Sequence, residues 1–305
     1  MKVGIIGLGR WGKKLLKIFD NLLDVKIISH KNNPKTRFWV KKYFPHVLTT
    51  LNYHDILHDK SIDAVIIATP INTHYQIAID ALVAKKHVFV EKPIAESRKE
   101  CNELLKMSKN KILFVGHTFL FDPCYRKLKE ISLNDKPYKV DLVWNKMGTF
   151  DEDLVDNLLS HDIAIIGDLL GFSIRNIKVN ALNGYLSDID YIDLSLDNGK
   201  NTKCQIKIDR VNPINQKLIR IECSSGDLYY WTVNKIYRLN KEKRKLEIFY
   251  ESKKDALEQE CLSFITCVET KIPPITDGFF GMEVVSVLDK IKRLCIPSMN
   301  NYHRP

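Results

Sequence analysis

The sequence predicts an α/β chain of two domains: a doubly wound parallel sheet, then an α+β domain with a large, mostly antiparallel open sheet. Two patterns carry this prediction. The first 120 or so residues alternate short apolar runs with amphipathic stretches, which is the rhythm of βαβ units. Residues 138–250 instead alternate apolar and polar side chains, as strands with one wet or helix-covered face do. Because 305 residues are enough for two cores, we expect domains at 1–120 and 121–305.

The N-terminal domain is expected to hold six strands joined by helices. The run from Asp63 to Ala68 is almost wholly apolar, as a strand covered on both faces should be. Leu15, Ile18 and Leu22 recur at helical spacing after the first strand. The expected strands are 2–6, 25–29, 47–49, 63–68, 87–90 and 112–116, and further helices are expected at about 73–85 and 97–108.

The C-terminal domain is expected to be a sheet interrupted by one helix and followed by two more. Alternating runs indicate strands, and Gly pairs such as Asn198-Gly199 supply the turn chemistry of hairpins. The clearest strands are 192–197, 204–209 and 219–223, and the helices are expected at about 156–170, 255–269 and 279–294.

Composition favours a cytoplasmic protein without a metal site. The seven cysteines are widely spaced with no CxxC pair, and the histidines do not cluster at ligand spacing. The formal net charge is +10, but the cations are dispersed, so we expect a solvated lysine surface and neither a nucleic-acid nor a membrane partner. No apolar run approaches the roughly 18 residues that span a bilayer.

A glycine-rich loop follows the first strand and opens the first helix. Gly7 permits a tight turn, Gly9 lets the backbone approach a pyrophosphate, and Gly12 lets helix and strand pack closely. The free N–H groups at the helix N-terminus favour phosphate. The loop, with Arg10 and Trp11 inside it, therefore predicts a Rossmann domain that binds NAD or NADP.

The end of the second strand bears on the choice between the two cofactors. An acidic residue there would bond the ribose 2′-hydroxyl of NAD, whereas a basic one accommodates the 2′-phosphate of NADP. The chain has Ser29-His30-Lys31 and no acid. This favours NADP slightly and leaves tolerance of both cofactors open, as well as the possibility that His30 and Lys31 only face water.

Three later strands also end in polar residues on the edge where an open parallel sheet binds ligands. Thr69-Pro70 and Asn72 to His74 follow the fourth strand, Glu91 and Lys92 follow the fifth with Pro93 behind them, and His117 follows the sixth. We expect Thr69, Pro70, Asn72, His74, Glu91 and Lys92 to contact the cofactor and His117 to line the substrate cleft. His74 could equally cap the next helix. Two charges at the end of an apolar strand are costly unless they have partners or work to do.

Together these motifs resemble the glucose–fructose oxidoreductase/inositol dehydrogenase (Gfo/Idh/MocA) family over essentially the whole chain. The segment from Gly116 to Pro123 is similar to the family's hinge, and Asn157 to Asp162 is similar to its second catalytic segment. The resemblance implies hydride transfer between a nicotinamide cofactor and a carbon of a sugar or polyol.

The resemblance also implies roles for single residues. Lys92, the lysine of the E-K-P motif, would orient the substrate hydroxyl, and His161, the histidine of a D-x-x-x-H pattern, would be acid/base or substrate-orienting. Asn157 stands where the family has Asp, and an amide can only hydrogen-bond. Asp156 and Asp162 are neighbours in sequence, but on a helix neither shares the face of His161. We therefore expect His161 and Lys92 to carry the chemistry, with Asn157 contacting the substrate.

Substrate and partners stay open at this point. The segment from Phe150 to Asp153 looks like family members that act on sugar-nucleotides, including UDP-N-acetylglucosamine 3-dehydrogenase, although a free sugar fits as well. A non-catalytic cofactor-sensing regulator, or a reductase of a non-sugar substrate with an unsaturated or imine bond, are alternatives. By resemblance we expect a homodimer or homotetramer formed through the C-terminal sheet.

Overall fold

The structure, a computed structural model, describes residues 1–199 and 202–299, with the backbone alone for 297–299. It forms two compact units. The first comprises residues 1–117 with 257–285, and the second comprises 118–256 with residues from 286 onward. Each unit is described in turn. In the described ranges no helix is both long enough and apolar enough to cross a membrane.

The first unit is built on a six-stranded parallel sheet of order β3-β2-β1-β4-β5-β6. The strand order reverses between β1 and β4, and ligands of such sheets bind at that point, beyond the carboxyl ends of the strands. The predicted doubly wound sheet is confirmed. The strands are β1 (Lys2–Ile6), β2 (Asp24–Ser29), β3 (Leu48–Thr50), β4 (Ala64–Ile67), β5 (His87–Glu91) and β6 (Leu113–Gly116).

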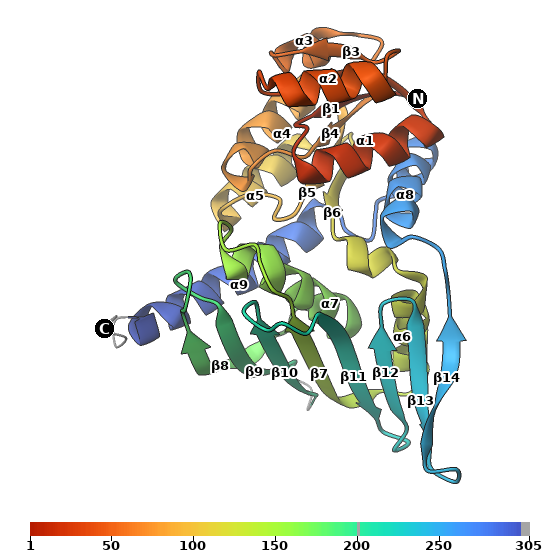
Figure 1. Cartoon of the computed structure of the whole chain (residues 1–305), viewed down its shortest axis with the longest axis vertical. Coiled ribbons are helices and arrows are strands. Elements are labelled where there is room, and N and C mark those ends of the chain that lie inside the picture. The colour runs from red at the N-terminus through yellow and green to blue at the C-terminus, as the bar shows by residue number, and fades with distance from the viewer. Residues whose placement is uncertain (200–201, 300–305) are drawn as a thin grey trace. The chain divides into compact units, whose positions relative to one another are not determined.

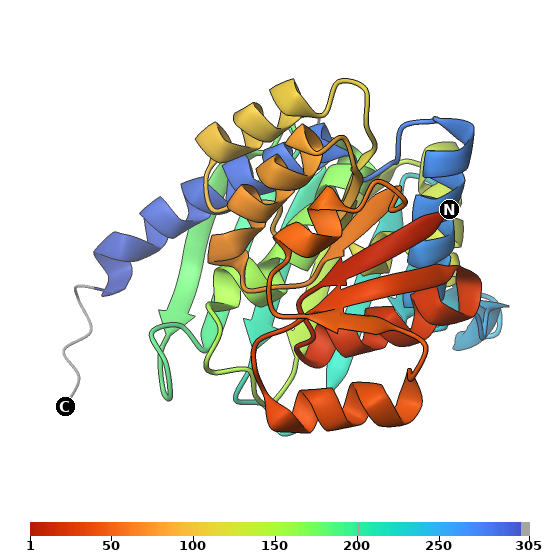
Figure 2. The same cartoon turned by 90° about the horizontal axis from the view of Figure 1, so that it is seen from above.

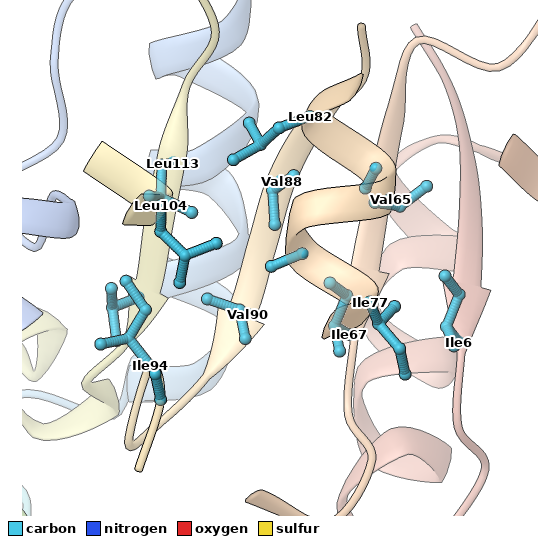
Figure 3. Close-up of a cluster of buried hydrophobic side chains, with 14 of the residues drawn as sticks. Ile6, Val65, Ile67, Ile77, Leu82, Val88, Val90, Ile94, Leu104 and Leu113 are labelled. Atoms are coloured by element: carbon cyan, nitrogen blue, oxygen red, sulfur yellow. The ribbon is translucent and has the colours of Figure 1, made fainter. Parts of the chain in front are cut away.

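Helices cover both faces of this sheet. Figure 2 shows α1 (Arg10–Leu22) and α2 (Pro34–Tyr43) on one face, with α4 (His74–Val83) and α5 (Arg98–Met107) on the other. Side chains of α4 and α5 pack on alternate residues of β4 and β5 in a continuous apolar cluster, which is drawn in Figure 3. The five-residue α3 (His54–His58) joins the same cluster. The sheet is therefore buried on both sides, which explains its near-continuous apolar strands.

A segment from near the C-terminus completes the first unit. Phe264 of α8 (Ala256–Thr270) packs edge-on against the rings of Phe19, Phe89 and Phe114, on the α1 face of the sheet. The start of α9 (Gly278–Met299) lies against the other face, where an added Cβ at Gly281 would meet Val115 at 2.9 Å. Residues 257–285 thus group with the parallel sheet, although they lie inside the expected 121–305 domain.

The second unit is built on an eight-stranded sheet of order β14-β13-β12-β11-β7-β10-β9-β8, visible in Figure 1. All neighbours are antiparallel except β7 and β10, which confirms a mostly antiparallel sheet. The strands are β7 (Pro137–Asn145), β8 (Arg175–Asn183), β9 (Tyr191–Asp197), β10 (Lys203–Asp209), β11 (Gln216–Cys223), β12 (Leu228–Thr232), β13 (Lys235–Asn240) and β14 (Lys245–Glu251).

One face of this sheet is covered and the other is charged. Helix α6 (Pro123–Asn134) packs on β12 to β14, and α7 (Ser160–Leu170) is joined to β11 by an ion pair. The opposite face carries a network in which Arg220 bridges Asp141 and Glu222 at 3.2 and 2.7 Å. The expected helix at 156–170 is two segments, a π-helical turn η3 (Val155–Leu159) followed by α7.

Candidate functional site

The glycine-rich loop has two glycines that the protein's own packing requires. Gly7 has φ +97°, which side chains rarely adopt, and an added Cβ would lie 2.6 Å from the Ala68 carbonyl oxygen. An added Cβ at Gly12 would lie 2.0 Å from the Gly7 carbonyl oxygen. Gly7 N–H also donates to the Ser29 carbonyl at 2.9 Å. These contacts fix the turn between β1 and α1.

Gly9 differs, because no contact with the described part of the chain requires a glycine there. It is exposed, its backbone is extended, and an added Cβ would meet no atom within 4 Å. Gly9 is also the N-cap of α1, which has no side-chain cap and no acidic residue in its first turn. No capping side chain therefore accepts from the first N–H groups of α1. A pyrophosphate fits this cradle, while Arg10 lies exposed beside it and Trp11 is half-buried.

The end of β2 holds one buried and one exposed basic residue. His30 is buried, and its Nδ1 lies 2.6 Å from the Lys31 carbonyl oxygen. Ser29 is also buried, whereas Lys31 is exposed. His30 therefore does not simply face water, and Lys31 is the cation of this segment that a ligand can reach.

The loop after β4 is tied to the loop after β5 through His74. Both ring nitrogens of this buried histidine lie 2.8 Å from carbonyl oxygens, Nδ1 from Pro93 and Nε2 from Thr69. Burial lowers the pKa of His74. Its side chain thus positions the two loops, and the exposed residues of this segment are Pro70 and Asn72.

Three titratable residues meet where β5 and β6 end. Burial raises the pKa of Glu91 to about 7, against the lowering effect of the Lys92 charge. Burial, and then the same Lys92 charge, lower the pKa of His117 to about 3, so its imidazole is neutral near pH 7. His117 is fully buried against Phe280, and its Nδ1 has no hydrogen-bond partner among the described residues. Lys92 is partly exposed, so this edge combines one reachable ammonium with a neutral imidazole.

The second unit places His161 among aromatic rings. The imidazole centroid lies 5.0 Å from the ring centroid of Phe119 and 5.5 Å from that of Trp144. Asn157 lies in the η3 turn that leads into α7, and both Asn157 and His161 are partly exposed. Single π-helical turns of this kind occur frequently at functional sites.

Both acids that flank this histidine segment are bound to lysines. Asp156 pairs with Lys292 at 2.6 Å, and the buried Asp162 pairs with the buried Lys217. Neither carboxylate is therefore available to stand in for the family's Asp at position 157. No group of three His, Cys, Asp or Glu side chains arranged to hold a metal occurs in the described residues.

Comparison with known proteins finds a family match for the N-terminal part of the chain. Residues 1–117 match the oxidoreductase family GFO_IDH_MocA, described as having an NAD-binding Rossmann fold. Over these residues the chain is similar to the Gfo/Idh/MocA family. The match of residues 1–117 to an NAD-binding Rossmann fold supports a nicotinamide cofactor.

Individual relatives cover only part of the chain or share little sequence. An uncharacterised oxidoreductase, YrbE of Bacillus subtilis, is 30% identical over 223 residues, 64% of either chain. The NADP-dependent scyllo-inositol 2-dehydrogenase IolW of the same organism is 29% identical over 66% of this chain and 60% of its own. The chain thus spans less than two thirds of each of these relatives. UDP-N-acetylglucosamine 3-dehydrogenase GnnA from Acidithiobacillus ferrooxidans has the same fold, with TM-score 0.88 at 20% identity over 96% of this chain and 97% of its own.

The predicted site residues do not include Lys217, which lies beside the histidine segment through its ion pair with Asp162. Lys217 begins the inward-facing series of β11, in phase with Ile219, Ile221 and Cys223, and it is buried with them. The signal was present, because a lysine in the apolar phase of an alternating strand must find a buried partner. Its partner, Asp162, could not be named without the fold.

Proposed function

We propose that this protein is an NAD(P)-dependent oxidoreductase that acts on a hydroxyl-bearing carbon of a sugar or sugar-nucleotide. One observation carries the proposal. The carboxyl edge of a single parallel sheet holds both a glycine cradle open to a pyrophosphate and, at the ends of β5 and β6, a reachable ammonium beside a neutral imidazole. The match of residues 1–117 to an oxidoreductase family supports the same reaction class.

The residues of the first unit would bind the cofactor and orient the substrate. When bound, a nicotinamide cofactor supplies or accepts the hydride. Gly9 and the first turn of α1 would hold its pyrophosphate, with Arg10 and Trp11 alongside. Lys92 would donate a hydrogen bond to the substrate hydroxyl and favour its alkoxide-like character. His117, being neutral, can accept or donate one further hydrogen bond at Nδ1.

His161 would take up or return the hydroxyl proton. Its partial exposure lets the imidazole reach a substrate, and its aromatic neighbours restrict the ring. Such general acid–base assistance contributes about 100- to 10,000-fold. Asn157 would hydrogen-bond the substrate, because its amide cannot exchange a proton. His161 and Lys92 would act on the same hydroxyl.

A sugar-nucleotide is the finer proposal for the substrate. The segment from Phe150 to Asp153 is held in place by Arg210, which donates to the carbonyls of Thr149 and Glu152 at 2.9 and 2.6 Å. A structurally similar protein is named for a UDP-sugar. A nucleoside diphosphate also suits a chain of net charge +10.

We also propose a slight preference for NADP and a homo-oligomeric state. The exposed Lys31 and the absence of an acid between Ser29 and Lys31 support the former, and one relative is named as NADP-dependent. The charged face of the eight-stranded sheet, which includes Arg220 and Glu222, is proposed as the surface of a homodimer or homotetramer in the cytoplasm. Light scattering that finds a monomer would contradict this assembly.

A spectrophotometric screen tests the activity. Free sugars, polyols and sugar-nucleotides are incubated with NAD, NADP and their reduced forms, and absorbance of the reduced nicotinamide is followed. We expect turnover that His161→Ala and Lys92→Met each reduce strongly, with cofactor affinity nearly unchanged for His161→Ala. In the double variant the two losses should not add, because both residues act on one hydroxyl. Cofactor binding without turnover on any substrate would instead favour a cofactor-sensing regulator.

A further inference from the structure

A buried ion pair lies directly beside the histidine segment. Lys217 on β11 donates to Asp162 on α7, and the two side chains are 5% and 0% exposed. Withdrawing two charges from water costs several kcal/mol per ion, and an apolar pair of similar volume is often at least as stable. The pair therefore needs an explanation other than the stability of the sheet–helix contact.

The same two aromatic rings contact both Lys217 and His161. Lys217 Nζ lies 3.9 Å from the ring centroid of Trp144 and 5.4 Å from that of Phe119. These are the rings that contact the imidazole of His161 at 5.5 and 5.0 Å. A cation within about 6 Å of an aromatic ring face is attracted to it, so the ammonium of Lys217 favours the observed positions of both rings.

The backbone also connects these residues in pairs. Lys217 is the direct cross-strand neighbour of Trp144 in the pairing of β11 with β7, and Asp162 directly follows His161 on α7. The ion pair thus joins the strand pair that carries Trp144 to the helix that carries His161. Any shift of α7 along the sheet would break it.

We propose that Lys217 is a positioning residue for His161. Together with Asp162 it would fix the register of α7, and through Trp144 and Phe119 it would fix the orientation of the imidazole. The inference rests on the proposed function of His161, but it also makes a claim about ring geometry that needs no turnover to test.

A second, less buried lysine–aspartate pair on the same helix serves as the control for general stability. Asp168, six residues after Asp162 on α7, is bound by Lys129 of α6. Lys129 contacts neither of the two rings by any interaction that the structure describes. Lys129→Met therefore removes a lysine–aspartate pair from the same helix and leaves the aromatic contacts of His161 in place.

The first experiment follows the His161 ring by NMR in protein carrying ¹³C at histidine Cε1. The His161 signal is assigned with His161→Gln, and Lys217→Met is compared with Lys129→Met. Because a single lysine removal leaves Asp162 buried alone, the double variant Lys217→Met/Asp162→Leu is included, with melting temperature as the check on folding. We expect the ring currents of Trp144 and Phe119 to displace the wild-type signal. That signal should move in both Lys217 variants and stay in place in Lys129→Met.

The second experiment measures turnover in the same proteins. We expect the double variant to melt near the wild type but to lose about tenfold to a hundredfold in kcat, as small misplacements of catalytic groups do, with cofactor affinity unchanged. Lys217→Arg, which keeps the cation, should retain most of the activity. An unmoved His161 signal in the folded double variant, or full turnover in it, would overturn the proposal. If the wild type turns over no substrate, the proposed function fails while the NMR comparison still decides the positioning role.

Discussion

Substitutions at Gly9 and Gly12 of the glycine loop should have different effects: the first should weaken cofactor binding, and the second should lower the stability of the protein. Gly9→Ala adds a Cβ that meets no atom of the described residues within 4 Å apart from its own chain neighbours, on a backbone that any residue adopts. The only intrinsic cost is that alanine is a poorer N-cap than glycine, about 1 kcal/mol or less, and Gly9→Ser avoids it because serine is a preferred N-cap. The new side chain fills the space that a pyrophosphate would need. We expect the loss of one charge-assisted hydrogen bond, about 1.5–3 kcal/mol, or roughly tenfold to a hundredfold in Kd.

Gly12→Ala should show the opposite behaviour. Its Cβ would lie 2.0 Å from the Gly7 carbonyl oxygen, so the backbone of β1 and α1 must separate. Overpacking of this kind costs about 1–3 kcal/mol, which lowers the melting temperature by about 3–10 °C. Differential scanning fluorimetry without cofactor measures the melting temperature of each variant, and calorimetric titration with NADH and NADPH measures its cofactor affinity. If Gly9→Ser binds cofactor as tightly as the wild type, the loop is not the pyrophosphate site.

Three further predictions concern charge. Lys31→Glu should weaken NADPH binding about tenfold relative to NADH, since a charged hydrogen bond is worth about 1.5 kcal/mol. Titration calorimetry measures the dissociation constants of both cofactors, and their ratio would not change if Lys31 does not face the 2′-phosphate. The raised pKa of Glu91, about 7 against 4.5, means that the folded state holds the proton more tightly. Stability should therefore fall, by an amount on the order of 3 kcal/mol, as the pH rises from 4.5 to 7. Glu91→Gln should remove that component of the pH dependence in urea melts, and an identical slope in the variant would contradict the assignment. Arg210→Met should destabilise the second unit by about 3–5 kcal/mol, because it leaves Asp190 buried without its 2.9 Å partner. Thermal unfolding measures this loss. A change below about 1 kcal/mol would mean that the Arg210–Asp190 pair contributes little to the stability of the second unit.

The parallel sheet could be predicted almost strand by strand from the sequence. Its strands are buried on both faces, so their apolar runs stand out, and β4 and β5 lie within a residue or so of the predicted limits. The helix α2 was missed because its apolar periodicity is weak. Its signal is local: Asn33 caps the helix by accepting from the N–H groups of Lys35 and Thr36, with Pro34 at the first position.

Contacts between residues that are far apart in the chain could not be predicted from the sequence. The sequence shows the apolar side of α8, but an apolar side indicates only that the helix packs against a hydrophobic core. It does not indicate which of the two cores. Phe264 packs against Phe19, Phe89 and Phe114, from three elements of the first unit, and only the fold brings these rings together. The roles of Lys92, Asn157 and His161 remain predictions for the same reason, because sequence motifs name the residues and not their shared ligand.

The surroundings of His161 suggest how the segment works without the aspartate that the family pattern has at position 157. Both nearby carboxylates are already bound, Asp156 to Lys292 and Asp162 to Lys217, so neither is left to face an imidazolium. The rings of Phe119 and Trp144 lie beside the imidazole, with centroids at 5.0 and 5.5 Å from it. The orientation of the imidazole would therefore come from this aromatic packing and from the Lys217–Asp162 pair rather than from a carboxylate at position 157.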